Sequence, residues 1–237
     1  MSDGSVDFRR SGAVGRIVLD RPAKRNALST QLLRELRGLL DAVGGESEIR
    51  VVTVEGAGPV FCAGADTREF GTATAETVRG PWTRLGQQVF AALAELPQTT
   101  VAVLTGGAYG GGLELAMHCD FRIAAPDAVL ALPEATLGTA PGWAGLGRIV
   151  ELAGLRAARM LALTGRTFTA AEALQFGLVD IVSDNLSEDV DELIDDILAT
   201  APLAQSIIKR ALVSREPSAT LVDSLAGAYL TTTARST

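Results

Sequence analysis

Two glutamates stand beside segments whose composition suits a reactive site. Glu114 follows three consecutive glycines in GAYGGGLELA (107–116), between an apolar strand pattern and a helical pattern. Glu134 follows Pro133 directly after another expected strand. Two carboxyl groups beside one water molecule can act as general base and general acid, because their repulsion raises the pKa of one of them. Each glutamate taken alone has a simpler explanation, since an acidic residue in the first turn stabilises a helix.

Two glycine- and alanine-rich segments could expose backbone amides to a ligand. Glycine loses more backbone entropy on folding than any other residue, so three in a row (110–112) indicate a close approach of the backbone to something. Free N–H groups at the start of the following helix, together with the helix dipole, favour an anion there. FCAGAD (61–66) is a second such segment after a strand, although taken alone it is better explained as a simple tight turn.

The charge of the chain limits its partners. The 237 residues carry a net charge of −7, with a pI of about 4.8, and this argues against nucleic-acid binding, which requires a basic surface. Lys24 and Arg25, and later Lys209 and Arg210, could offer local positive charge to an anionic ligand. Most such pairs are solvated surface charges.

Few other reactive groups are present. His118 is the single histidine, so a zinc site is not expected, and its place within a helical pattern favours a structural role. Cys62 and Cys119 form no disulfide framework and fit a reducing cytoplasm. No GxxxxGK[ST] loop, no apolar run of about 20 residues and no secretory signal pattern occurs, so neither a nucleotide-triphosphate site nor a membrane location is expected.

Apolar strands alternate with helices along most of the chain, which predicts an α/β fold with largely parallel sheets. The expected strands are 14–19, 50–56, 100–106, 120–124, 128–131 and one within FGLVDIV (176–182). The expected helices run from Ser29 to Gly44 and over 82–96, 113–118, two segments after Trp143, 170–176 and most of 186–235. Residues 67–81 are polar and are expected to be irregular. This pattern predicts a core over 1–185 that carries the site and a helical assembly region over 186–237.

Five ordered segments together resemble the crotonase superfamily, the enoyl-CoA hydratase/isomerase family. They are DRPAKRNALS (20–29), FCAGAD (61–66), GAYGGGLELAMHCDFRIAA (107–125), LPEATLGTAPGW (132–143) and LTGRTFTAAEALQFGLVDIV (163–182). The resemblance covers roughly residues 14–215. It implies a crotonase-like spiral of ββα units with a helical C-terminal region that assembles trimers, often paired into hexamers.

The resemblance also implies how a thioester would react. The family's oxyanion hole maps to the backbone N–H groups of Ala65 and Gly111, which would stabilise an acyl-CoA enolate. Glu134 would handle the proton at the α-carbon, and Glu114 would share the attacking water. Isomerase relatives usually keep only the later glutamate, so the pair favours hydration of a 2-enoyl-CoA. No separate cofactor is implied, because coenzyme A is part of the substrate.

Further family positions would bind the substrate. Lys24 and Arg25 would face the phosphates of coenzyme A, while Ala27 and Leu28 would line the adenine or pantetheine path. Gly142 lies beside the acyl group in the family, and Trp143 would form a wall of the pocket. The remaining substrate-contacting positions are Ala63, Gly64, Asp66, Gly110 and Pro133.

Other functions fit the same sequence. An enoyl-CoA isomerase, or another enolate enzyme of this fold such as a dehydratase, decarboxylase or thioester hydrolase, would use the same oxyanion hole. A non-catalytic acyl-CoA-binding or assembly protein is an alternative of another class, although a decayed site need not keep both glutamates. The chain ends at Thr237, before the last helix and basic tail usual in the family, so we expect these to be absent or to lie outside this sequence.

Overall fold

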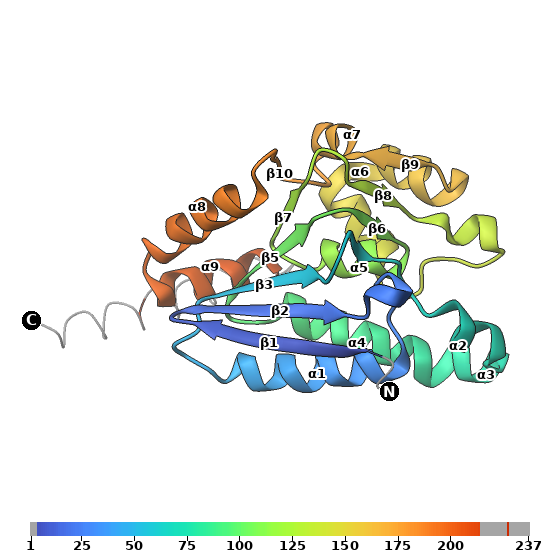
Figure 1. Cartoon of the computed structure of the whole chain (residues 1–237), viewed down its shortest axis with the longest axis horizontal. Helices are drawn as coiled ribbons and strands as arrows, with labels where there is room; N and C mark the ends of the chain where they lie inside the picture. Colours follow the sequence, from blue (N-terminus) through green and yellow to red (C-terminus); the bar gives the residue numbers. More distant parts are fainter. Residues whose placement is uncertain (1–3, 214–226, 228–237) are drawn as a thin grey trace, which may run out of the picture.

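A six-stranded sheet is the framework of the molecule, and its first strands run along the long axis (Figure 1). The computed structural model describes residues 4–213 and residue 227. In spatial order the strands of this sheet are β1 (Ser5–Ser11), β2 (Val14–Asp20), β3 (Val51–Gly56), β5 (Thr99–Leu104), β7 (Phe121–Ala124) and β10 (Ile181–Val182). β1 and β2 form an antiparallel hairpin, and all the later neighbours pair in parallel.

In a second, smaller sheet, three of the four strands each follow directly on a strand of the large sheet, and the fourth follows a helix. Its order is β4 (Val60–Cys62), β6 (Gly107–Tyr109), β8 (Val129–Ala131) and β9 (Thr167–Thr169). The chain therefore repeats one unit: a strand in the large sheet, a strand in the small sheet, then helix. The helices that close these units are α4 (Thr83–Ala94), α5 (Gly111–Met117) and α6 (Gly145–Thr164). This repeat confirms the expected α/β spiral of ββα units.

Helices cover both faces of the large sheet. On one face lie α4 and α1 (Thr30–Gly44), whose start is capped by Ser29 Oγ accepting the N–H of Leu32. The opposite face is covered by α8 (Leu186–Leu198), which buries Val190 and Ile194 against strand residues such as Val51. Alternate residues of a strand point to opposite faces of the sheet. Because helices cover both faces, the central strands are apolar on both.

The structure differs from the sequence-based prediction at two places near the N-terminal half. β1 was not predicted, because SVDFRRS is a half-exposed edge strand without an apolar run. The prediction that residues 67–81 are irregular is wrong: they form α2 (Thr67–Thr72), α3 (Ala75–Thr77) and most of a π-helical turn (Val78–Trp82). Side-chain caps rather than apolar periodicity begin α2 and α3, and a search for periodicity does not detect them.

The C-terminal part follows the prediction as far as it is described. α6 changes direction at Gly154, which has a non-helical φ of 76°, so the two expected helices are both present. Thr169 and Glu172 form a capping box at the start of α7 (Ala170–Gln175), within the expected helix 170–176. After α8 comes α9 (Pro202–Val213); the helix expected to continue to residue 235 lies outside the described residues, apart from residue 227. Among the described helices, none combines the length and apolarity that crossing a bilayer requires.

Candidate active site

The two glycine- and alanine-rich loops meet because the strands before them are neighbours. β4 pairs in parallel with β6, so the segments that leave their carboxyl ends lie together. The contact is backbone to backbone: a Cβ placed on Gly64 would lie 2.6 Å from the carbonyl oxygen of Tyr109 and 3.0 Å from the amide nitrogen of Gly111. Gly64 also has a φ of 89°, which side chains strongly disfavour. Only glycine allows this approach.

Two backbone amides are free at this meeting point. Ala65 is bracketed by hydrogen bonds to Leu28, which use the carbonyl of Gly64 and the N–H of Asp66 and leave the N–H of Ala65 unused. Gly111 is the first residue of α5, where an N–H has no partner within the helix. Neither amide donates to an acceptor within residues 4–213. The two lie close together, since a Cβ on Gly111 would be 3.5 Å from the nitrogen of Ala65.

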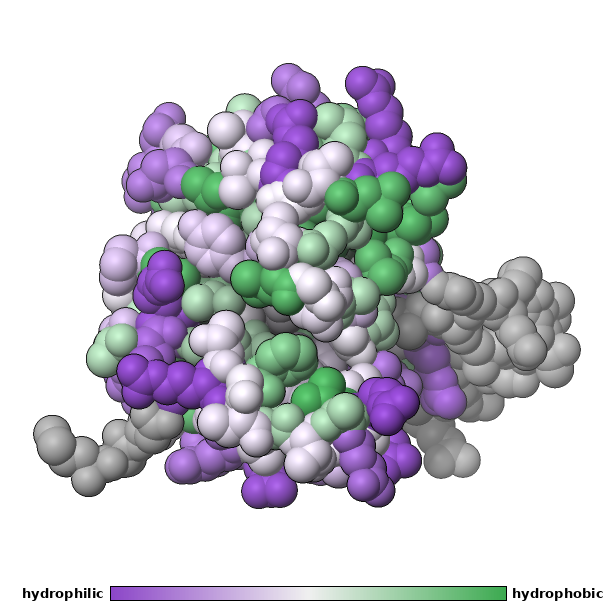
Figure 2. All heavy atoms as spheres, turned by 90° about the vertical axis from the view of Figure 1, so that its right-hand side faces the viewer, coloured by the Kyte–Doolittle hydropathy of each residue, from purple (hydrophilic) through white to green (hydrophobic). Residues whose placement is uncertain are grey.

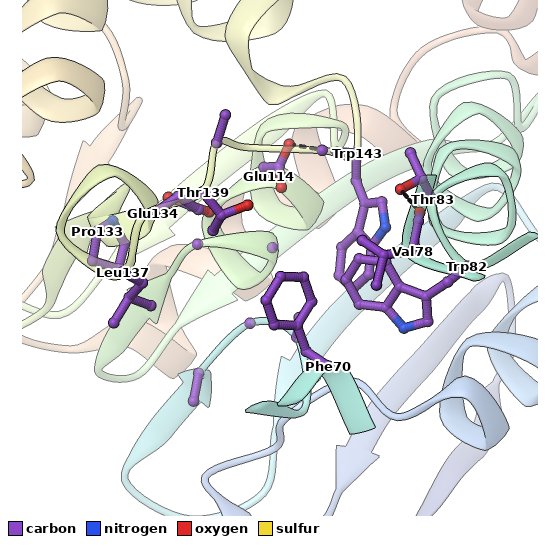
Figure 3. A pocket seen from close by; sticks show the side chains of 17 residues that line it. Phe70, Val78, Trp82, Thr83, Glu114, Pro133, Glu134, Leu137, Thr139 and Trp143 are labelled. Atoms are coloured by element: carbon purple, nitrogen blue, oxygen red, sulfur yellow. Dashed lines mark hydrogen bonds between the residues drawn. The ribbon is translucent and has the colours of Figure 1, made fainter. Parts of the chain in front are cut away.

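Ala65 and Gly111 both line a largely apolar cavity of about 270 Å³ (Figure 3). Phe70 from α2, Trp82 at the end of the π-helical turn and Trp143 before α6 form its aromatic walls. The other lining residues are Ala63, Gly64, Ala65, Val78, Thr83, Gly110, Gly111, Glu114, Pro133, Glu134, Leu137, Thr139, Ala140 and Gly142. On the face of the molecule that carries α2 and the segment after β8, the central surface is mostly apolar or weakly polar (Figure 2).

Glu114 is buried at the back of this cavity, with 2% of its surface exposed. Its Oε1 accepts the backbone N–H groups of Trp143 at 3.0 Å and Gly145 at 2.8 Å. Ala144, with a φ of 72°, provides the left-handed turn between these two donors. Gly145 must lack a side chain, because a Cβ there would lie 2.4 Å from Cγ of Glu114.

Burial dominates the titration of this carboxyl group. It raises the pKa of Glu114 to about 7; the N–H groups of Gly145 and Trp143 oppose the shift, and the nearby charge of Glu134 adds to it. The carboxyl group therefore changes its protonation state near neutral pH. The N–H groups occupy Oε1, which leaves Oε2 for a partner in the cavity.

Glu134 reaches the cavity from a short 3-10 helix (Pro133–Leu137) that follows β8 (Figure 3). Its Oε2 is buried and has no hydrogen-bond partner among the described residues. Burial raises the pKa of this carboxyl group as well. A Cβ on Gly110 would lie 2.8 Å from Oε1, so Glu134 borders the start of the loop that carries the Gly111 amide. The structure thus brings both predicted glutamates and both predicted amides to one cavity.

The segment expected to receive coenzyme A lies outside the cavity lining. Arg25 is exposed, Lys24 is half-buried, and neither forms an ion pair within the described residues. Ala27 is also half-buried. The expectation that the Leu28 side chain lines the ligand path is wrong, because that side chain is fully buried in the main core. Leu28 instead holds the segment around Ala65 through its backbone.

Asp66 has a structural contact that the sequence did not reveal. Its Oδ2 lies 2.6 Å from the guanidinium of Arg21, and both side chains are almost fully buried. Burial acts to raise the pKa of Asp66, but the hydrogen bonds from Arg21 and from the N–H groups of Arg68 and Glu69 outweigh it and lower the pKa. Asp66 does not line the cavity; it ties the segment after Ala65 to the loop before Leu28 and caps α2.

Two other charged or titratable groups have structural environments. Lys209 is not available to an anionic ligand, because its Nζ lies 2.6 Å from Oδ2 of Asp120 and donates to the carbonyl of Gln98. His118 packs its ring 5.4 Å from that of Phe90, and burial lowers its pKa. These contacts fit the structural role expected for His118.

Sequence reasoning missed the part of the cavity wall that comes from outside the five family segments or follows Glu134. Phe70, Val78 and Trp82 come from the segment predicted to be irregular, and Leu137 and Thr139 follow Glu134 without a recognisable pattern. The indole of Trp82 within a polar stretch was the available signal, since a large apolar ring there needs a partner to cover it.

Known proteins are similar to this chain in sequence and in fold. The sequence profile described as "Enoyl-CoA hydratase/isomerase" matches residues 9–228. The short-chain-enoyl-CoA hydratase of Clostridium acetobutylicum is 35% identical over 216 residues, which cover 90% of this chain and 82% of that protein. The crystal structure of an enoyl-CoA hydratase from Bacillus anthracis has a TM-score of 0.87 at 36% identity, covering 96% of this chain and 90% of the other.

One of the similar structures was solved with a ligand. It is a Thermobifida fusca protein in complex with CoA, with a TM-score of 0.87 at 30% identity, and the match covers 97% of this chain and 94% of that one. The match to the family profile spans nearly the whole chain, and the relatives agree with it in sequence and in fold. The chain belongs to the enoyl-CoA hydratase/isomerase family.

Proposed function

We propose that this protein is an enoyl-CoA hydratase, which adds water across the 2,3 double bond of an acyl-CoA thioester. The observation that carries the proposal is the convergence of two free backbone amides and two glutamates with raised pKa values on one apolar cavity. Amides and acids meet two separate demands of the reaction, since one pair stabilises charge and the other moves protons.

The amides bind the thioester oxygen. As water attacks C3, negative charge moves to this oxygen, and the N–H groups of Ala65 and Gly111 donate to it. One such donor typically contributes about 3 kcal/mol to transition-state stabilisation in a site that excludes water. The apolar walls of the cavity keep this interaction strong by holding the local dielectric constant low.

The glutamates complete the proton transfers. Glu114, held through Oε1, takes a proton from the attacking water at Oε2 as the hydroxyl group bonds to C3. Glu134 in its protonated form delivers its proton to C2, and the enolate returns to a thioester. The proton on Glu114 then passes back to Glu134 through solvent, so the pair ends with the one proton it began with. Raised pKa values on both acids allow a single proton to be kept near neutral pH.

The coenzyme A part of the substrate would bind outside the cavity. The phosphates of coenzyme A would meet Lys24 and Arg25, neither of which has an ion-pair partner in the described part of the chain. No cofactor beyond the coenzyme A of the substrate takes part in the proposed reaction. Cys62 and Cys119 are buried and unpaired, which supports a reducing, cytoplasmic location.

Hydration assays on purified protein test this proposal. A panel of 2-enoyl-CoA thioesters should lose absorbance of the conjugated double bond as water adds. Glu114→Gln and Glu134→Gln should each lower kcat by at least about 100-fold, the range for a lost acid or base. Glu76→Gln, an exposed glutamate on α3, is the matched control.

The same assay separates the alternative reactions. Conversion of a 3-enoyl-CoA to the 2-enoyl isomer without hydration would identify an isomerase and contradict the proposal. Full hydration activity in a folded Glu114→Gln or Glu134→Gln variant would contradict the role assigned to that residue.

A further inference from the structure

The indole of Trp143 fills the space between the oxyanion loop and α4. It is 1% exposed yet lines the cavity. Its six-membered ring lies directly on Gly111, where a Cβ would be 2.4 Å from Cζ3, and its other edge lies on α4, where a Cβ on Gly86 would be 2.2 Å from Nε1. Both neighbouring positions are glycines, and at each of them a side chain would collide with this ring.

Other aromatic rings hold the indole in place. The ring of Trp82 lies 4.7 Å from it at a tilt of 43°, and that of Phe90 meets it nearly edge-on at 5.4 Å. Phe70 extends the cluster on the far side of Trp82, at 5.8 Å. In Figure 3 the two indoles form one side of the cavity, opposite Pro133 and Leu137. A packed aromatic wall of this kind cannot rearrange freely to admit a longer ligand.

The reacting carbons must lie next to this wall. The thioester oxygen is placed at the Gly111 amide, which the indole contacts, and C3 is placed at Glu114. The backbone N–H of Trp143 donates to the carboxylate of Glu114. An acyl chain that continues beyond C3 therefore reaches the Trp143–Trp82 wall within its first few carbons.

From this geometry we infer that Trp143 limits the length of the acyl group, and that the protein prefers short, uncharged 2-enoyl-CoA substrates. The inference rests on the proposed function and specifies its substrate class. Absence of charge in the acyl group follows from the lining: among the described residues, the charged side chains facing the cavity are Glu114 and Glu134, and no cation is present to receive a second carboxylate.

A chain-length series tests the inference. The wild-type protein should give its highest kcat/KM with butenoyl- or hexenoyl-CoA and a lower value with decenoyl-CoA. Trp143→Ala should raise the ratio of decenoyl to butenoyl kcat/KM by at least about tenfold, because each methylene taken out of water adds about fourfold. Phe168→Leu, a buried aromatic position in the small sheet, is the matched control and should leave the ratio unchanged.

Gly86 supplies an independent test of the same wall. In the wild-type background, Gly86→Ala places a methyl group against the indole and should shorten the accepted chain. In the Trp143→Ala background the same change should leave the length profile unaltered, because the ring it displaces is gone. An equal effect of Gly86→Ala in both backgrounds would overturn the inference. Trp143→Leu, which keeps an apolar side chain in the core, replaces Trp143→Ala if the latter does not fold.

Binding measurements separate failure of the inference from failure of the proposed function. Saturated acyl-CoAs of the same lengths do not react, and their affinities can be measured by calorimetry for each variant. Binding with the same length profile in wild type and Trp143→Ala, or a wild-type preference for the decanoyl chain, overturns the inference alone. A shifted binding profile without hydration supports the length limit and contradicts the hydratase assignment. No binding of any acyl-CoA contradicts both.

Discussion

Replacing Glu114 by glutamine should make the protein more stable at alkaline pH while it lowers activity. The amide has the shape of the carboxyl group, and its oxygen can still accept the N–H groups of Trp143 and Gly145. What changes is charge, because the wild-type group must ionise inside a site where 2% of its surface is exposed. The variant removes the cost of placing that charge there.

The size of the effect follows from the pKa. Burial raises the pKa of Glu114 from its ordinary value of 4.5 to about 7. The folded protein then binds this proton more tightly than the unfolded chain does, so the free energy of unfolding falls as pH rises from 4.5 through 7. A shift of this size corresponds to about 3 kcal/mol. The contribution is fully present at pH values below 4.5 and lost above 7.

Urea unfolding of both proteins across this pH range measures the difference. The stability of Glu114→Gln relative to wild type should rise by about 3 kcal/mol between pH 4.5 and pH 8. Comparison with Glu76→Gln removes general effects of losing an exposed glutamate. A difference that does not vary with pH, or a variant that becomes relatively less stable at pH 8, would refute the reasoning about burial.

Three further predictions address the amides, the buried ion pair and assembly. Gly111→Pro removes one oxyanion donor, and we would make it in the Trp143→Ala background, where no indole collides with the proline ring. It should abolish exchange of the substrate's α-hydrogen with deuterium. Gly111→Ala in the same background keeps the N–H group and should retain exchange. Asp66→Asn leaves the buried guanidinium of Arg21 without its counter-charge and should lower the free energy of unfolding by about 3–5 kcal/mol in urea titrations; a loss below 1 kcal/mol would contradict the importance of the pair. Sedimentation at micromolar concentration should show a trimer or hexamer, because α9 exposes apolar side chains such as Ile208, and a monomer alone would refute the assembly expected for the C-terminal region.

The residues of the site were predictable where local chemistry demanded an unusual composition. Three glycines before Glu114, and the alanines and glycine around Ala65, signalled backbone contact, and the structure brings these loops together. The bonds that hold Glu114 could not be predicted, because their donors, at Trp143 and Gly145, come from a turn some thirty positions later that only the folded chain brings close.

The same contrast applies to the fold. Apolar strands followed by helices predicted the spiral, since burial on both faces leaves a clear pattern in sequence. The walls contributed by α2 and the turn ending at Trp82 left no such pattern. α2 begins at the side-chain cap of Asp66, and α3, which leads into the turn, begins at that of Thr74. Leu28 was assigned to the ligand path for a related reason: sequence shows that a residue is apolar, but not which side of the loop it occupies.

The hydrogen bonds between the loop around Arg25 and the segment around Ala65 have a mechanical consequence. The N–H of Ala63 donates to the carbonyl of Arg25, Leu28 bonds on both sides of Ala65, and the Arg21–Asp66 pair closes the same short span. A nucleotide anchored at Lys24 and Arg25 would thus be attached to the same stiff unit that carries the Ala65 amide. In such a unit the distance between the bound nucleotide and the Ala65 amide would be fixed. Thioesters whose carrier arm differs in length from that of coenzyme A should then be turned over more slowly even when they bind, since their carbonyl would stop short of the amides or pass them.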